Sequence, residues 1–130
     1  MGARFLIDTN TVIYYLNGVL PKTAKEKIDN CLTVASYLSI INKIELLGWN
    51  PPEGISIEPV EKFVNASIIL ALDDSVVQKT IEIRKLKRIK LPDAVIAATA
   101  LVYGFEIISR NKSDFSDIAG LNCYDPFTDF

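Results

Sequence analysis

The sequence predicts an α/β fold, in which helices stack in layers against a mostly parallel sheet. Short apolar runs typical of buried strands alternate along the chain with longer segments that have helical periodicity. Residues that favour turns or helix ends separate these segments. The sequence contains no internal repeat, low-complexity stretch or linker, so one domain is expected over residues 1–130.

The first half of the chain contains three predicted strands, at residues 4–7, 34–41 and 67–72. Helices are predicted at residues 11–17, after Pro21, at 43–48 and at 59–65. Gly18 is expected to end the first of these helices, and Asn42 to cap the third at its N-terminus.

The second half begins with a long amphipathic helix, which is capped by Asp73 or Asp74 and ends near residue 88. Pro92 opens the next helix, which is expected to run from 94 to 103 with Gly104 as its C-cap. Because this helix is apolar nearly all round, it is predicted to be buried. A strand at 105–109, a helical turn at 113–118 and a short strand at 122–124 complete the chain.

The composition excludes several kinds of catalysis. The chain has no histidine, which removes Ser-His-Asp and Cys-His catalysis and every histidine metal site. Its two cysteines, Cys31 and Cys123, are too few for a structural zinc site. A hydrolase of this composition would rely on carboxylates, whose hard oxygens favour Mg²⁺ or Mn²⁺. No apolar run reaches the length of roughly 20 residues that spans a bilayer, so a cytoplasmic protein is expected.

Four acidic residues are predicted to meet at one edge of the sheet. Asp8 follows the first strand, Glu45 the second and Asp114 the fourth. Asp93 lies in the first turn of the buried helix that leads to the fourth strand. Ligands of such sheets bind outside the carboxyl ends of the strands. Crowded carboxylates repel one another, and a divalent cation would supply the missing charge.

Each of these acids also has a purely structural explanation. Asp8 and Asp114 are acceptable helix caps or turn residues. Glu45 would complete a capping box with Asn42, and Asp93 suits the positive end of a helix dipole. Four unrelated caps are not expected at the same end of one sheet, which favours the metal site.

Four stretches of the sequence resemble the four blocks of PIN-domain proteins, and most closely those of the VapC toxins of bacterial toxin–antitoxin pairs. The stretches are LIDTN at 6–10, NKIELLG at 42–48, KLPDAVIAATA at 90–100 and SRNKSDF at 109–115. They occur in the right order and cover most of the chain. Asp-Thr-Asn alone is a weak signal, whereas the third and fourth blocks together are much more specific.

The resemblance implies a three-layer α/β/α sandwich and an endoribonuclease that uses Mg²⁺ or Mn²⁺, is inhibited by an antitoxin protein and forms a homodimer. The implied catalytic and metal-binding residues are Asp8, Glu45, Asp93 and Asp114. Thr9, Ser109 and Asn111 would be supporting polar groups. Ser109 stands where threonine is more usual in the family and keeps the hydroxyl.

The net charge of −2 does not exclude an RNA substrate, because removing the four acids from the total leaves +2 on the remainder. Five cations lie in residues 84–90, Lys87 and Arg88 among them, and form either a solvated helix face or an RNA-binding strip. Arg110 and Lys112, beside the fourth block, are expected to be better placed to contact a phosphate near the metal.

Three other classes of protein share part of this pattern. A phosphoacceptor signalling domain needs its aspartate on a middle strand and an acidic pair near the first strand, which residues 8–10 do not offer. A haloacid-dehalogenase-type phosphatase needs an aspartate where Asn10 stands. The stronger alternative is a PIN fold without catalysis that binds RNA or protein. RNA binding without metal-dependent cleavage would identify it.

Overall fold

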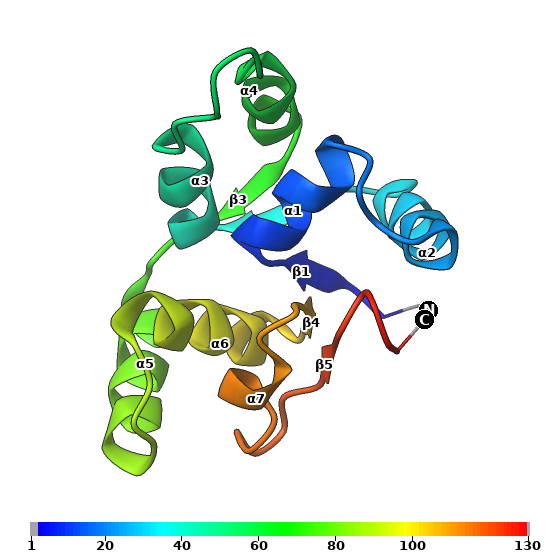
Figure 1. Cartoon of the computed structure of the whole chain (residues 1–130). Helices are drawn as coiled ribbons and strands as arrows, with labels where there is room; N and C mark the ends of the chain where they lie inside the picture. Colours follow the sequence, from blue (N-terminus) through cyan, green and yellow to red (C-terminus); the bar gives the residue numbers. More distant parts are fainter. Residues whose placement is uncertain (1–2, 130) are drawn as a thin grey trace.

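The computed structural model describes residues 3–129 and shows a five-stranded sheet whose neighbouring strands are all parallel (Figure 1). Residues 1, 2 and 130 of the predicted domain lie outside the described residues. The strands are β1 (Phe5–Ile7), β2 (Tyr37–Ser39), β3 (Ile68–Leu70), β4 (Glu106–Ile108) and β5 (Cys123–Tyr124). Their order across the sheet is β3-β2-β1-β4-β5, so β1 is the central strand.

Helices cover both faces of the sheet, which confirms the three-layer α/β/α sandwich (Figure 1). The helices are α1 (Thr9–Leu16), α2 (Lys22–Leu32), α3 (Ile40–Leu47), α4 (Glu58–Asn65), α5 (Asp74–Leu86), α6 (Leu91–Tyr103) and α7 (Lys112–Phe115). Among residues 3–129, none of these helices has the length and apolar character needed to cross a membrane.

Two hydrophobic cores lie on opposite faces of the sheet, because consecutive residues of a strand point to opposite sides. Leu6 of β1 and Ile107 of β4 pack into the core that includes α5 and α6. Their neighbours Ile7 and Ile108 pack into the core beneath α1 to α4. The central strands are therefore apolar at successive positions, as expected of a parallel sheet buried on both sides. This burial fixes the strand ends that carry the site.

The predicted start of α3 is wrong. Ser39 caps this helix, and Asn42 lies in its first turn. The Ser39 hydroxyl accepts a hydrogen bond from the backbone N–H of Asn42 at 3.2 Å, and the Asn42 side chain accepts one from the N–H of Ser39 at 2.9 Å. This is a complete capping box, so Glu45 is not needed for it and lies free to face the site.

The predicted caps of α5 and α6 are confirmed. Gly104 adopts a left-handed conformation with φ of 75° directly after α6. Asp73 caps α5, and its carboxylate accepts a hydrogen bond from the backbone N–H of Val76 at 3.0 Å. The Tyr103 hydroxyl donates to the same carboxylate, which ties the N-terminus of α5 to the C-terminus of α6.

We expect Asp73→Ala to lower the free energy of unfolding by about 1 kcal/mol or slightly more, because it removes this cap. Urea unfolding would measure the loss. Asp74→Ala is the matched control, since it removes the next acid of the same helix without breaking the cap bond, and should cost less than half as much. Equal losses in the two variants would attribute the effect to the helix dipole instead of the cap.

Candidate active site

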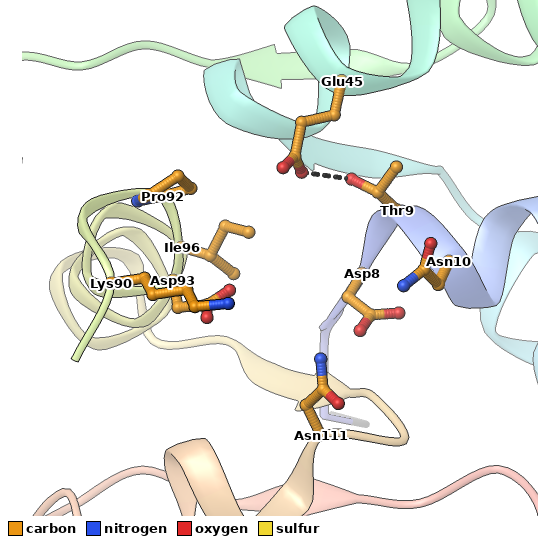
Figure 2. Close-up of a pocket in the computed structure, with 9 residues that line it drawn as sticks. All are labelled: Asp8, Thr9, Asn10, Glu45, Lys90, Pro92, Asp93, Ile96 and Asn111. Atoms are coloured by element: carbon orange, nitrogen blue, oxygen red, sulfur yellow. Dashed lines mark hydrogen bonds between the residues drawn. The ribbon is translucent and has the colours of Figure 1, made fainter. Parts of the chain in front are cut away.

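A cavity of about 250 Å³ opens at the carboxyl edge of the sheet, where β1 and β4 end (Figure 2). Figure 2 shows side chains converging on it from the start of α1, from α3, from the start of α6 and from the segment after β4. Its lining residues are Asp8, Thr9, Asn10, Glu45, Lys90, Pro92, Asp93, Ile96 and Asn111. Three of the four predicted acids therefore face one cavity.

Asp8 is held in place by hydrogen bonds to both of its carboxylate oxygens, and its exposed fraction is 8%. Oδ1 accepts a hydrogen bond from the backbone N–H of Thr11 at 2.9 Å, and Oδ2 accepts one from the hydroxyl of Ser109. The Ser109 oxygen in turn accepts a hydrogen bond from the backbone N–H of Asn111 at 2.9 Å. Asp8 is thus both the N-cap of α1 and a wall of the cavity.

Glu45 is oriented by a chain of hydrogen bonds that starts in the core. The fully buried side chain of Asn42 donates from Nδ2 to the Thr9 hydroxyl at 3.2 Å. That hydroxyl donates to Oε1 of Glu45 at 2.6 Å (Figure 2). Because the Thr9 oxygen accepts from Asn42, its own proton is directed at Glu45.

The protonation of Asp93 depends on the charges around it. Its pKa is raised, first by partial burial and then by the negative charges of Asp114, Glu45 and Asp8, while Lys90 acts in the opposite direction. Asp114 lines an adjoining hollow of about 330 Å³, whose wall also contains Asp93. All four predicted acids therefore lie within electrostatic reach of one another.

The acidic cluster fits a hard divalent cation by its donor chemistry and by its unbalanced charge. Carboxylate oxygens are the ligands that Mg²⁺ and Mn²⁺ prefer, and a cation would relieve the repulsion that raises the pKa of Asp93. Within residues 3–129, no three acidic or cysteine side chains converge closely enough to form a ready metal-binding group. This geometry suits an ion bound partly through water, as Mg²⁺ commonly is.

The cations predicted beside the site have other partners. Lys87 forms an ion pair with Asp117. Lys112 forms one with Asp129 at 2.9 Å. The guanidinium of Arg110 lies 4.0 Å from the ring centroid of Phe127. Arg110 and Lys112 line neither the acidic cavity nor the adjoining hollow, which argues against the expectation that they are best placed near the metal. Arg88 lines the adjoining hollow.

Sequence reasoning missed three residues of the site. Asn10, which directly follows Thr9 in α1, lines the cavity. Lys90 lines both the cavity and the adjoining hollow, and its place directly before the Leu-Pro-Asp motif was an available signal. Asn42 acts through Thr9, and nothing in its sequence position distinguishes this role from helix capping.

The raised pKa of Asp93 predicts that Asp93→Asn stabilises the metal-free protein at neutral pH, by up to about 1 kcal/mol because the site is partly exposed. A carboxyl whose folded pKa is raised contributes its full stability below its unfolded pKa and loses it as pH rises through the folded value. The gain from Asp93→Asn should therefore disappear as the pH is lowered towards 4. Urea unfolding with chelator at both pH values would measure it.

Asp117→Asn is the control for this experiment, because Lys87 lowers the pKa of Asp117. A carboxyl with a lowered pKa contributes stability above its unfolded pKa, so this substitution should not stabilise at pH 7. A gain from Asp93→Asn that grows on acidification would contradict repulsion among the four acids.

The fold and the site together define an α/β/α protein with a carboxylate-lined cavity at the carboxyl edge of its parallel sheet. Residues 5–121 match the PIN domain family. The chain belongs to this family, and the resemblance inferred from the four sequence blocks is confirmed. No curated protein shows a significant match to the chain.

Solved structures share the fold over nearly the whole chain. A toxin–antitoxin complex from Klebsiella pneumoniae contains a chain that is 24% identical, with a TM-score of 0.74 and 97% and 98% of the two chains covered. DNA-bound VapBC from Salmonella typhimurium gives 24% identity, a TM-score of 0.74 and coverage of 96% and 99%. FitAcB from Neisseria gonorrhoeae gives 26% identity, a TM-score of 0.69 and coverage of 95% and 99% of the two chains.

Proposed function

We propose that this chain is a metal-dependent endoribonuclease and the toxin of a toxin–antitoxin pair. The observation that carries the proposal is the meeting of carboxylates from distant sequence segments, since Asp8, Glu45 and Asp93 line one cavity and Asp114 lines the hollow that adjoins it. Membership of the PIN family supports nuclease chemistry. The similarity to chains of toxin–antitoxin complexes supports the biological role.

In this proposal Asp8, Glu45, Asp93 and Asp114 hold Mg²⁺ or Mn²⁺, partly through water. The bound ion would neutralise charge on the phosphate and supply an activated water. Ser109 and the Thr11 N–H keep Asp8 in a fixed orientation, and Thr9 does the same for Glu45. Attack by water instead of the ribose 2′-hydroxyl leaves a 5′-phosphate on the product.

Cleavage of total cellular RNA by the wild type and by Asp93→Asn, each with Mg²⁺ and with chelator, tests the proposal. We expect cuts only in the wild type with Mg²⁺, and products that carry a 5′-phosphate. A 2′,3′-cyclic phosphate would reject attack by water. Cuts that survive both the chelator and the substitution would reject the metal site.

The alternative is a PIN domain that binds RNA or protein without cutting. It predicts that the folded wild type binds RNA while leaving a range of RNAs intact with either metal. The four acids grouped in this chain favour the nuclease, because a binding module for a polyanion gains nothing from them.

We further propose a cytoplasmic protein that binds an antitoxin and forms a homodimer. Exposed aliphatic side chains on two helices support the binding of partner proteins, since burying them would be favourable. They include Ile44 and Leu47 of α3 and Val77 and Ile81 of α5. Light scattering of the purified chain would measure self-association, and a monomer at all concentrations would reject the dimer. Co-purification with the product of an adjacent small gene would identify the antitoxin.

A further inference from the structure

We propose that Arg88 and Lys90 form a phosphate-binding track that leads the RNA strand from the acidic cavity across the connection between α5 and α6. The inference rests on the proposed ribonuclease function and assigns the path of its substrate. It replaces the expectation that Arg110 and Lys112 bind the phosphates nearest the metal.

Three hollows follow one another along this connection. The acidic cavity and the adjoining hollow of about 330 Å³ share Lys90 and Asp93 in their walls. The adjoining hollow shares Arg88 and Ile89 with a third one of about 360 Å³, which is lined by residues 84–89. A strand of nucleic acid leaving the carboxylates in this direction therefore meets cations at each step.

The connection between α5 and α6 exposes these two cations. Lys87 and Lys90 have extended backbone angles. Lys87 forms an ion pair with Asp117, and Ile89 is buried in the core. Arg88 and Lys90 are exposed. Lys87 and Ile89 hold the connection in place, so the positions of Arg88 and Lys90 on the surface are fixed.

Arg88 and Lys90 have no salt-bridge partner within residues 3–129, although the charge of Lys90 acts on the neighbouring Asp93. Neither the Arg88 nor the Lys90 side chain forms a salt bridge or hydrogen bond with a described residue. On the other side of the site, the C-terminal segment supplies Asp129 to Lys112 and Phe127 to Arg110. Unpaired positive charge next to the carboxylates thus lies on the α5–α6 side.

The chemistry of the pair suits phosphates of a nucleic acid chain. A guanidinium binds phosphate oxygens through two parallel N–H donors, and an ammonium adds a point charge. An approaching RNA is repelled by the acids of the cavity, and adjacent cations offset that repulsion. An acidic protein segment would also be attracted, but the continuity of the hollows with the carboxylates favours the substrate.

The test compares the double variant Arg88→Ala/Lys90→Ala with Lys112→Ala and with Lys62→Ala. Lys62 is paired with Glu58 on α4, and Lys62→Ala is the control for the loss of one positive charge elsewhere on the protein. Fluorescence anisotropy of a labelled single-stranded RNA oligonucleotide, with chelator present to prevent cutting, gives the dissociation constant as a function of salt. Each phosphate contact to single-stranded nucleic acid adds about 0.7 to the slope of log affinity against log salt.

We expect the double variant to lower that slope by about 1.4. When salt is raised from about 50 to about 200 mM, the factor by which its RNA affinity falls should therefore be about sevenfold smaller than for the wild type. With Mg²⁺, Arg88→Ala alone, which leaves the lining of the acidic cavity intact, should raise the KM for RNA several-fold while kcat changes less than about twofold, the pattern of a lost binding contact. Lys112→Ala and Lys62→Ala should retain the wild-type slope.

An unchanged slope in the double variant, or an equal fall in Lys112→Ala, would overturn the track. So would binding of poly-glutamate in place of RNA at these residues. The binding assay needs no cleavage, so a wild type that binds with the expected slope but never cuts would reject the nuclease and keep the track. A wild type that cuts, with a double variant of unchanged slope, would reject the track alone.

Discussion

Asp8→Asn is expected to reduce metal-dependent RNA cleavage by about 10³-fold, a loss typical of removing one preorganised charge contact to the reacting group or its metal. The substitution removes the negative charge at the cavity but keeps an oxygen that can accept the hydrogen bond from the backbone N–H of Thr11. The hydroxyl of Ser109 can accept as well as donate, so it tolerates the new amide. The fold should therefore survive, and kcat/KM for a defined RNA measures the loss.

Asp8→Ala separates the two roles of this residue. It removes the charge and also the N-cap of α1, so it should be as inactive as Asp8→Asn and in addition less stable by about 1 kcal/mol. Asp74→Asn, an exposed acid at the start of α5, is the control and should cut RNA at the wild-type rate. Near-normal cleavage by Asp8→Asn would place the catalytic charge elsewhere.

The order of helices and strands was predictable because each depends on local pattern. α6 is apolar nearly all round and is followed by Gly104, and both features act within a few residues. The bounds of β2 were not predictable. Its predicted start, Val34, is 92% exposed, and its predicted end became α3 because the Ser39 hydroxyl caps a helix there. A run of apolar residues does not reveal where such a cap intervenes.

The proximity of Asp8, Glu45 and Asp114 was predictable from one rule, that the carboxyl ends of parallel strands share an edge, and that of Asp93 from its place at the start of the helix that leads to β4. The contacts that orient them were not, because they join residues distant in sequence. Ser109 and Asp8 are 101 positions apart. The same applies to the cations, since the pairing of Lys87 with Asp117 and of Lys112 with Asp129 depends on tertiary structure. Sequence places charges along the chain but does not reveal which ones are neutralised.

Asn42→Ala is expected to have the largest effect on stability, lowering the free energy of unfolding by about 2–4 kcal/mol. The side chain is fully buried, and its loss leaves the backbone N–H of Ser39 without its acceptor and the hydroxyl of Thr9 without the donor that fixes it. Cleavage should fall as well, because Thr9 is then free to turn away from Glu45. Urea unfolding and kcat/KM under conditions where the variant is folded would measure the two effects.

Two further variants distinguish positioning from capping. Ser39→Ala breaks the capping box but leaves the bond from Asn42 to Thr9, so it should cost about 1 kcal/mol of stability and little activity. Thr9→Val removes the hydroxyl that reaches Glu45. If Asn42 acts through Thr9, the double variant Asn42→Ala/Thr9→Val should cut RNA no more slowly than the slower of the two single variants. Activity losses that multiply instead would mean that the two residues act independently, and Glu45 would then owe its orientation to something other than this chain of hydrogen bonds.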